Sequence, residues 1–182
     1  DVQISLLTYM ATMQTLSDIN PEPIGNAHFV HVPYNSFTTK NGFVVIAVIT
    51  DAFWEELLNV VNIDSLRDPK FNKSVNRLKN QEFIESELNK ILSTKNSEFW
   101  IKALNDAKVP CAPINTFKQA LSDEQVIHRN MVVQVEHPDG GKVKMPGNPV
   151  KLSYTNEDSY SPPPHLGKDT REILKCWADY DE

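Results

Sequence analysis

The sequence predicts an α+β fold, in which a small antiparallel sheet packs with several helices. Two segments show apolar and polar residues in alternation on either side of turn residues, which is the pattern of β-hairpins. Between these segments, apolar residues recur at the three- and four-residue spacing of amphipathic helices. The two hairpins and the helices between them indicate one α+β unit.

The chain opens with a predicted helix that ends near Leu16 and is followed by a linker. Its apolar residues lie at helical spacing: Val2, Leu6, Met10 and Met13. Residues 17–23 end the helix, because their two prolines disfavour helical backbone in the residues before them. The first residue is Asp1, with no methionine and no targeting segment ahead of the helix. Natural chains rarely begin in this way, so we expect the sequence to be a fragment of a longer protein.

A first hairpin is predicted after the loop 25–34. Its strands are expected at 35–38 and 43–49, with the turn at Lys40-Asn41-Gly42. Asn-Gly between apolar runs is a strong hairpin pattern, because both residues tolerate a positive φ.

The middle of the chain predicts three helices. The first begins at Thr50 or Asp51, either of which can cap it, and the others span about 80–92 and 97–107. Their expected buried residues are, in order, Phe53, Leu57, Leu58 and Val61; Ile84, Leu88 and Ile91; Trp100, Ile101 and Leu104. Residues 109–114 are expected to be extended, since each of their two prolines biases the preceding residue away from helix.

The last third predicts two short helices, a second hairpin and a closing helix. Residues 116–119 and 122–125 both match the capping-box pattern that begins a helix. The second hairpin has its strands at 131–137 and 142–145, its turn at Pro138-Asp139-Gly140-Gly141, and a further short strand at 150–152. Residues 154–164 are a proline-rich surface connection, and the closing helix follows at 169–178.

Composition limits the possible functions. The 182 residues carry a net charge of −6 and a pI near 5.4, whereas a nucleic-acid-binding surface is normally basic. The longest apolar run, 43–49, is far shorter than the roughly 18 residues that cross a bilayer. Cys111 and Cys176 have no metal-binding or redox spacing and suit a reducing compartment. We therefore expect no nucleic-acid partner and no membrane association.

Seven short motifs then occur in order along the whole chain. They are Asp1-Val2-Gln3-Ile4-Ser5-Leu6-Leu7; Gly25-Asn26-Ala27-His28 with Pro33-Tyr34-Asn35-Ser36-Phe37; Asn41-Gly42; Asp68-Pro69-Lys70-Phe71 with Arg77 and Asn80; Val109-Pro110-Cys111-Ala112-Pro113-Ile114; His137-Pro138 with Gly141 and Gly147-Asn148-Pro149-Val150-Lys151-Leu152-Ser153; and Pro164-His165-Leu166-Gly167-Lys168-Asp169-Thr170. No single motif is specific. In this register they resemble the class III CoA-transferases, the family of formyl-CoA transferase, carnitine CoA-transferase and α-methylacyl-CoA racemase.

The resemblance implies a domain organisation. Members of that family have a Rossmann-like large domain and a smaller α+β domain, and their monomers interlock as dimers. Residues 1–24 are then a helix and linker from the large domain, 25–150 are the small domain, and 151–182 are a linker and helix returning to the large domain. The apolar faces of the two terminal helices are expected to contact a second copy of the chain, in a homodimer.

The resemblance also implies a chemistry. In that family an aspartate attacks a donor thioester, and CoA reaches a carboxylic acid acceptor through an aspartyl-CoA intermediate. The aspartate lies upstream of the first motif, and Asp169 belongs to the last one, so no catalytic residue is expected in this chain. Coenzyme A is implied as a substrate rather than a permanently bound cofactor, with an acyl-CoA and a small carboxylic acid as partners.

Several alternatives stay open at this point. The segment 136–167 looks nearest to the branch that handles succinyl or glutaryl groups. A racemase of the same fold and a non-catalytic dimerisation module are the other interpretations. The implied compartment is the cytoplasm or, in a eukaryote, the mitochondrial matrix.

The candidate substrate- and CoA-binding residues also follow from the resemblance: Leu6, Asn26, Ala27, His28, Phe29, Val30 and His31. Leu6 stands near a family position beside the CoA site, although helix packing also explains it. Residues 28–31 replace a glycine-rich loop that closes over the active site in some members. Without glycines, a stiffer wall with imidazoles is favoured over a mobile lid. No metal is expected at His28 and His31, because no third ligand accompanies them, and Cys111 is expected to be a buried thiol.

Overall fold

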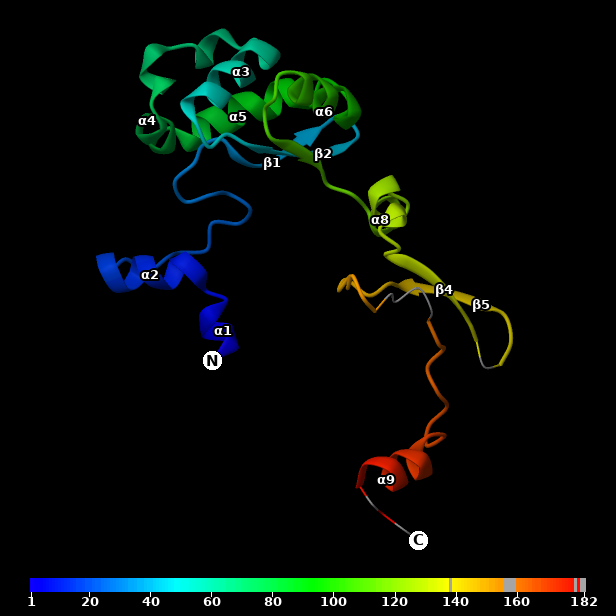
Figure 1. Ribbon diagram of the computed structural model, residues 1–182. Helices are drawn as coiled ribbons and strands as arrows, with labels where there is room; N and C mark the ends of the chain where they lie inside the picture. The colour runs from blue at the N-terminus through cyan, green and yellow to red at the C-terminus, as the bar shows by residue number, and fades with distance from the viewer. Residues whose placement is uncertain (138, 156–159, 179, 181–182) are drawn as a thin grey trace. The chain divides into compact units, whose positions relative to one another are not determined.

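The computed structural model describes residues 1–137, 139–155, 160–178 and 180 (Figure 1). The chain forms two compact units, Asp1–Ile114 and Asn115–Glu182. The predicted small domain, 25–150, crosses the boundary between these units. How the segments are divided among the domains of a longer protein stays a prediction.

The first unit contains most of the regular structure. Its elements are α1 (Val2–Ser5), α2 (Thr8–Ser17), β1 (Tyr34–Thr39), β2 (Gly42–Ala47), α3 (Asp51–Val61), the 3₁₀ turns η1 (Asp64–Leu66) and η2 (Pro69–Asn72), α4 (Ser74–Lys79), α5 (Gln81–Leu92), α6 (Ser97–Asp106) and β3 (Cys111–Pro113). The second unit has α7 (Phe117–Leu121), α8 (Glu124–His128), β4 (Val132–Glu136), β5 (Lys142–Pro146) and α9 (Thr170–Ala178).

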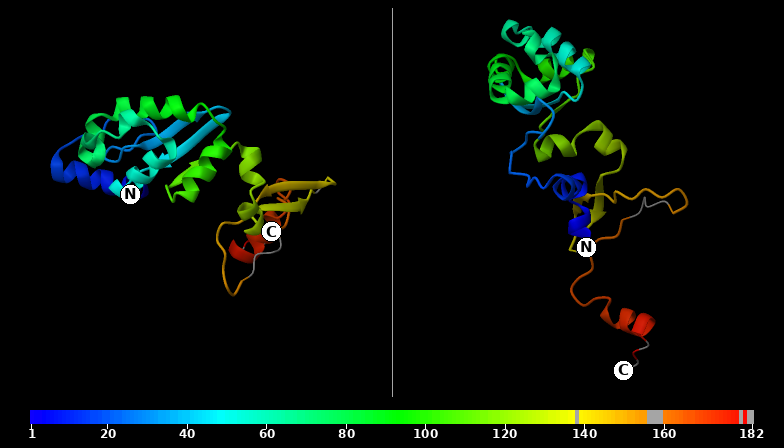
Figure 2. Two further views of the ribbon diagram at one scale, coloured as in Figure 1. Left: turned by 90° about the horizontal axis from the view of Figure 1, so that it is seen from above. Right: turned by 90° about the vertical axis from the view of Figure 1, so that its left-hand side faces the viewer.

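The first unit is built on a three-stranded antiparallel sheet in the order β1-β2-β3. Helix α5 packs against β1, α6 packs against β2 and β3, and α3 contacts both helices (Figures 1 and 2). A small antiparallel sheet with several helices is the predicted α+β fold, which is confirmed.

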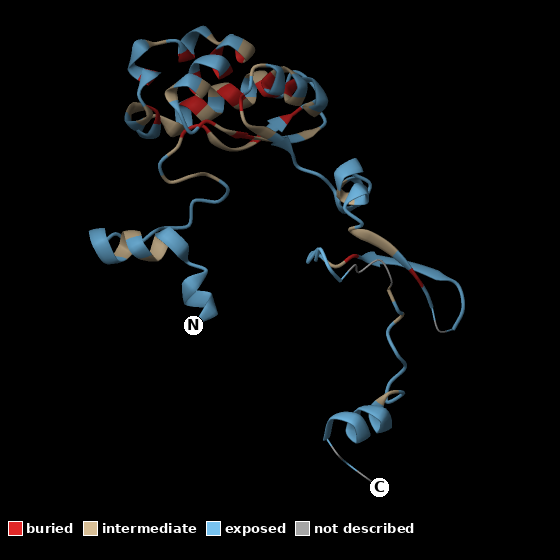
Figure 3. Cartoon of the chain, in the orientation of Figure 1, coloured by how far each residue is buried: buried red, intermediate tan, exposed pale blue. Residues whose placement is uncertain are grey.

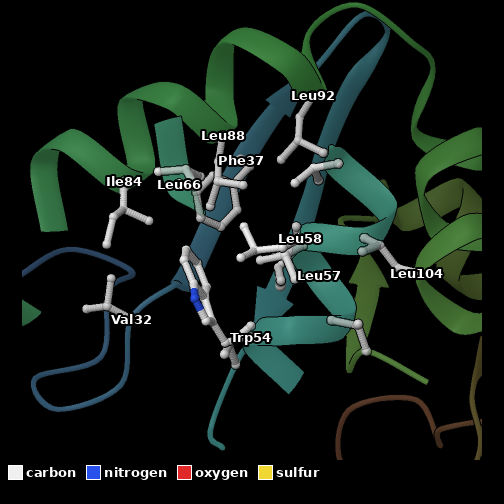
Figure 4. Packing of buried hydrophobic residues seen from close by; sticks show 14 of the residues in the cluster. Val32, Phe37, Trp54, Leu57, Leu58, Leu66, Ile84, Leu88, Leu92 and Leu104 are labelled. Carbon is white, nitrogen blue, oxygen red and sulfur yellow. The ribbon is translucent and has the colours of Figure 1, made fainter. Parts of the chain in front are cut away.

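One face of the sheet packs against the core, because successive side chains of a strand point to opposite faces. Phe37 of β1 and Val44 and Ile46 of β2 are fully buried, whereas Phe43 is 51% exposed. Buried residues gather where the helices meet this face (Figure 3). Figure 4 shows Leu57, Leu66, Leu88 and other apolar side chains converging there.

The three central helices form where they were predicted, but two of their buried faces are wider than expected. Trp54 and Leu92 are fully buried, and they follow the predicted Phe53 and Ile91, which are only partly buried. An apolar stripe more than 100° wide on a helix includes both members of such a pair, so spacing alone did not distinguish them. Thr50 is the cap of α3, because its hydroxyl accepts the N–H of Phe53.

The turn of the first hairpin differs from the prediction. Thr39 pairs with Gly42, so Lys40 and Asn41 alone form the connection, and neither Asn41 nor Gly42 has a positive φ. Instead, the Asn41 side-chain oxygen accepts the N–H of Ser97, the first residue of α6, at 2.8 Å. Asparagine serves here as a link between the hairpin and a helix terminus.

The prediction of a single opening helix is wrong, because the structure has two helices in this segment. The chain breaks between α1 and α2, where Thr8 has a φ of 49°. Neither helix contains a buried residue. Helices in proteins are stabilised mainly by packing of an apolar face, so the spacing of these residues did not ensure a continuous helix.

The segment between α3 and α5, expected only as a connection, holds a buried cation. Arg77 of α4 is 1% exposed. Its Nε donates to the Val32 carbonyl, Nη1 donates to the Phe71 carbonyl, and Nη2 contacts the Asp51 carboxylate, each at 2.9 Å. Its guanidinium carbon also lies 5.2 Å from the ring of Trp54. Such a charge is tolerated in a core only when it is paired and hydrogen-bonded.

The second unit confirms several local predictions. The capping box of α7 forms between Thr116 and Gln119, whereas α8 is capped by Asp123 rather than by Ser122. Strands β4 and β5 pair as the predicted second hairpin. Residues 150–152 are not a strand. The predicted turn residue Pro138 and part of the predicted connection, 156–159, lie outside the described residues.

No helix in the described part of the chain is both long enough and apolar enough to cross a membrane.

Replacing Arg77 by methionine should lower the free energy of unfolding of the first unit by about 3 kcal/mol, because it leaves two buried carbonyls without their donor. Lys102→Met is the matched control, since its exposed pair with Asp106 should contribute less than about 1 kcal/mol. Urea unfolding followed by tryptophan fluorescence measures both values, because Trp54 and Trp100 are buried in this unit. Equal stability of the two variants would contradict the assignment of Arg77 as a core anchor.

Candidate functional site

The predicted site residues lie mainly on the loop that joins α2 to β1. The loop is fixed at its C-terminal end by its backbone. The Val32 carbonyl accepts from Arg77, and the Pro33 carbonyl accepts the N–H of Val48 at 2.8 Å. The N–H of His28 donates to the Tyr34 carbonyl at 3.1 Å and closes the loop. Val32 and Pro33 are buried, so the chain enters the core directly after the site residues.

His28 organises the tip of this loop. Its Nδ1 accepts the backbone N–H of Val30 at 3.0 Å and that of His31 at 3.2 Å. A neutral imidazole has one donor nitrogen and one acceptor nitrogen. These two bonds therefore assign the proton of neutral His28 to Nε2.

Aromatic rings surround the His28 imidazole. Its ring centroid lies 4.5 Å from that of Phe29 in a stacked arrangement, 4.7 Å from that of His31 and 5.1 Å from that of Tyr34. Phe29 in turn lies 5.8 Å from Tyr9 of α2. These ring contacts agree with the predicted wall of aromatic and imidazole side chains, whose stiffness stays a prediction.

The electrostatic environment favours the neutral form of His28. Burial lowers the pKa of this imidazole, and the positive charge of a protonated His31 lowers it further. The Nδ1 atom of His31 is itself buried and has no hydrogen-bond partner among the described residues. The imidazole nitrogens of His28 and His31 are therefore polar atoms in a cluster that is otherwise formed by aromatic rings.

Of the other predicted site residues, Asn26, Ala27 and Val30 lie on the same loop as His28, whereas Leu6 does not. The Asn26 amide nitrogen donates to the hydroxyl of Ser36 at 3.1 Å, and Ala27 is partly buried. Val30 is 42% exposed at the tip of the loop. Leu6, by contrast, ends α1 with 72% of its surface exposed, and it takes part in none of the ring contacts or hydrogen bonds of His28.

A cleft that sequence reasoning missed adjoins this loop. Its volume is about 630 Å³, and it lies between the loop and the junction of α4 with α5. Its lining residues are Ile24, Ala27, Leu78, Lys79, Asn80, Gln81, Glu82, Phe83 and Glu85. Glu85 accepts from the side-chain amides of Asn35 and Gln81, at 3.0 and 2.9 Å. Ala27 and Asn80 belong to two separate motifs of the sequence, and nothing in those motifs indicates that the two residues line one cleft.

Similarity to known proteins shows the family of the chain. The family model described as CoA-transferase family III matches residues 1–170. The chain belongs to CoA-transferase family III. The resemblance carried by the seven motifs is thereby confirmed.

Curated relatives of this family III chain are CoA-transferases by name. Succinyl-CoA:glutarate CoA-transferase of Mus musculus is 33% identical over 185 residues, covering 99% of this chain and 42% of the relative. Acetyl-CoA:oxalate CoA-transferase of Acetobacter aceti is 30% identical over 153 residues, covering 84% of this chain and 37% of the relative. The chain therefore spans about two fifths of the length of these relatives.

Solved structures share the fold. A CAIB/BAIF family protein from Brucella suis matches with a TM-score of 0.76 and 25% identity, over 94% of this chain and 44% of that protein. Rv3272 of M. tuberculosis matches with a TM-score of 0.76 over 96% of this chain and 45% of that protein, and its 18% identity indicates the fold alone.

Neither Cys111 nor a metal-binding cluster is favoured as a reactive site in the described part of the family III chain. Burial raises the pKa of the Cys111 thiol, which disfavours the nucleophilic thiolate. The thiol contacts the Ile101 carbonyl and the side-chain oxygen of Asn105. Within the described ranges, no group of three or more His, Cys, Asp or Glu side chains could hold a metal ion.

The imidazole of His28 should titrate below the ordinary histidine value of about 6.5. The unfolded protein then binds this proton more readily than the folded one does. The contribution of His28 to the free energy of unfolding is accordingly complete above about pH 6.5 and falls as the pH decreases from there through its folded pKa.

Proton NMR titration of the imidazole and urea unfolding between pH 5 and 8 test this expectation. His28→Asn is the comparison, because it removes the titrating group and keeps an oxygen acceptor near the position of Nδ1. The wild type should lose more stability than the variant on acidification. A His28 that titrates above 6.5 would contradict the buried environment described for it.

Proposed function

We propose that the protein is an acyl-CoA:carboxylate CoA-transferase, which moves CoA from a thioester donor to a carboxylic acid acceptor. The observation that carries this proposal is the family match over residues 1–170, together with curated relatives named as CoA-transferases. Coenzyme A is a substrate in this reaction. The nucleophile is an aspartate outside these 182 residues, and this chain supplies no catalytic residue.

The proposed chemistry passes through three covalent intermediates on that aspartate, namely a mixed anhydride with the donor acid, an aspartyl-CoA thioester and a mixed anhydride with the acceptor acid. Its carboxylate attacks the acyl carbonyl, the carbon–sulfur bond breaks, and CoA thiolate leaves a mixed anhydride. The thiolate then attacks the aspartyl carbonyl, which releases the donor acid and forms aspartyl-CoA. The acceptor carboxylate attacks the aspartyl-CoA carbonyl, the carbon–sulfur bond breaks, and CoA thiolate is released as a second mixed anhydride forms. The thiolate then attacks the acceptor acyl carbonyl of this anhydride, which produces the new acyl-CoA and restores the aspartate. Each step develops negative charge on an oxygen, so the site needs donors aimed at oxygen.

We propose that the acids between which CoA is moved are succinate, glutarate or other short dicarboxylic acids. The support is the 33% identity with the mouse succinyl-CoA:glutarate CoA-transferase across nearly the whole chain. The transferase names of the relatives reported above favour transfer over racemisation. The substrate- and CoA-binding residues proposed from this chain are Leu6 and the loop residues Asn26, Ala27, His28, Phe29, Val30 and His31.

We also propose that the enzyme is a homodimer. The apolar residues of α9 support this, since Ile173 is 55% exposed, Leu174 is 40% exposed and Trp177 is 87% exposed. An apolar stripe of this kind normally contacts another surface. The two unpaired thiols agree with a reducing compartment, for which we propose the cytoplasm, or the mitochondrial matrix in a eukaryote.

A transfer assay on the full-length protein tests the proposed activity. The donor is succinyl-CoA, and the acceptors are glutarate, oxalate and mesaconate, which the names of relatives suggest. New acyl-CoA should form with at least one dicarboxylate, whereas residues 1–182 alone should be inactive. Epimerisation of a 2-methylacyl-CoA without any CoA transfer would contradict the proposal and favour the racemase.

A further inference from the structure

We propose that His28 is a substrate-binding residue whose Nε2–H group donates a hydrogen bond to a carboxylate or acyl oxygen of the substrate. This inference rests on the CoA-transferase function proposed above. It assigns a defined chemical role, a neutral donor directed at oxygen, to one atom of the loop.

The hydrogen bonds at Nδ1 determine which nitrogen can donate. Nδ1 accepts from the N–H groups of both Val30 and His31, at 3.0 and 3.2 Å. Protonation of Nδ1 would turn two attractive contacts into clashes between donors. The Nε2–H tautomer is therefore the one that the folded loop stabilises.

The Nε2 atom is available to a ligand. It makes no hydrogen bond to another residue in the described part of the chain, and it is absent from the buried polar atoms that lack a partner. An atom without a partner that is not among the fully buried ones retains accessible surface for a ligand. The backbone thus occupies one nitrogen of His28 and leaves the other free to bind.

The surroundings of His28 suit a neutral donor. Burial and the neighbouring His31 both oppose a positive charge, and Tyr34 is the other titratable ring in contact. A neutral imidazole polarises a carbonyl oxygen without transferring its proton to a carboxylate. The substrate of the proposed reaction carries both kinds of oxygen.

The loop also holds the donor in place. The Val32 and Pro33 carbonyls are bonded to Arg77 and Val48, and the rings of Phe29 and His31 lie within 5 Å of the imidazole by centroid distance. A donor that needs no rearrangement stabilises developing charge more than a mobile one does. Backbone amides fulfil this role in glycine-rich loops, and here a side chain would replace them.

Two substitutions separate substrate binding from a purely structural role of His28. In His28→Asn the side-chain oxygen can accept the same two backbone N–H groups, but nothing replaces Nε2–H. In His28→Gln the amide nitrogen reaches toward the Nε2 position and keeps a donor there, while the acceptor near Nδ1 is lost. A structural residue would tolerate asparagine better than glutamine, and a substrate donor would show the opposite order.

The test measures steady-state CoA transfer by the full-length wild type and both variants, with succinyl-CoA and a dicarboxylate acceptor. His28→Asn should lower kcat/KM by about 10- to 100-fold, and His28→Gln should lose less. His137→Asn is the control, because His137 Nδ1 accepts the N–H of Asp139 in a similar way in the β4–β5 hairpin. This control should keep wild-type activity.

The kinetic constants also show which oxygen is bound. A rise in KM for the acceptor alone indicates its carboxylate, whereas a fall in kcat with every acceptor indicates the acyl oxygen. Nitrogen-15 NMR of the labelled imidazole, at pH 7, provides a second readout that does not depend on activity. It should show a protonated Nε2 and an unprotonated Nδ1.

Besides a His28→Asn variant that is more active than His28→Gln, two results would overturn this inference while the CoA-transferase function stands. One is an active wild type with an equally active His28→Asn variant, and the other is an imidazole protonated at Nδ1 at pH 7. A wild type that transfers CoA to no acceptor contradicts the proposed function itself, and the role of His28 falls with it.

Discussion

The buried guanidinium of Arg77 joins three segments that are distant in the sequence. Among the described residues it is the one charged side chain in the buried core. A cation removed from water is strongly destabilising unless its donors find partners. Arg77 meets this condition through the Val32 carbonyl, the Phe71 carbonyl and the Asp51 carboxylate, which belong to the loop before β1, to η2 and to α3. Lysine could not replace it, because only the guanidinium has donors diverging in a plane.

This constraint connects the core to the candidate site. Val32 is where the loop enters the core, and its carbonyl is the atom that Arg77 holds. Four residues earlier, His28 accepts two backbone amides and arranges the rings around it. Under the proposed function, side chains of this loop would supply the hydrogen-bond donors that backbone amides supply in a glycine-rich loop.

Much of the fold could be predicted from the sequence, because the elements predicted correctly are determined by residues close to one another in the chain. The two hairpins, the three central helices and the cap at Thr50 depend on neighbouring residues, so periodicity and capping chemistry were sufficient. The role of Asn41 depends on Ser97, which lies 56 residues further along the chain. Local patterns contain no information about such partners.

The site was predicted less completely than the fold. The loop residues were identified from a family resemblance, and the structure brings His28, Phe29 and His31 together. Sequence reasoning could not show that Nδ1 of His28 is occupied, that Arg77 anchors the loop, or that Ala27 borders a cleft beside α5. Each of these facts joins the loop to itself or to residues of α4 and α5, which follow it by some 50 positions.

Amide hydrogen exchange in an Arg77→Lys variant tests the dependence of the site on the core most directly. The amides to follow are those of Val30 and His31, which donate to His28 Nδ1. If Arg77 positions the loop, exchange at these two amides should accelerate in the variant far more than exchange at the β2 amides, which the sheet protects. Unchanged protection at Val30 and His31, in a variant whose core has loosened elsewhere, would show that the loop holds its shape without the buried cation.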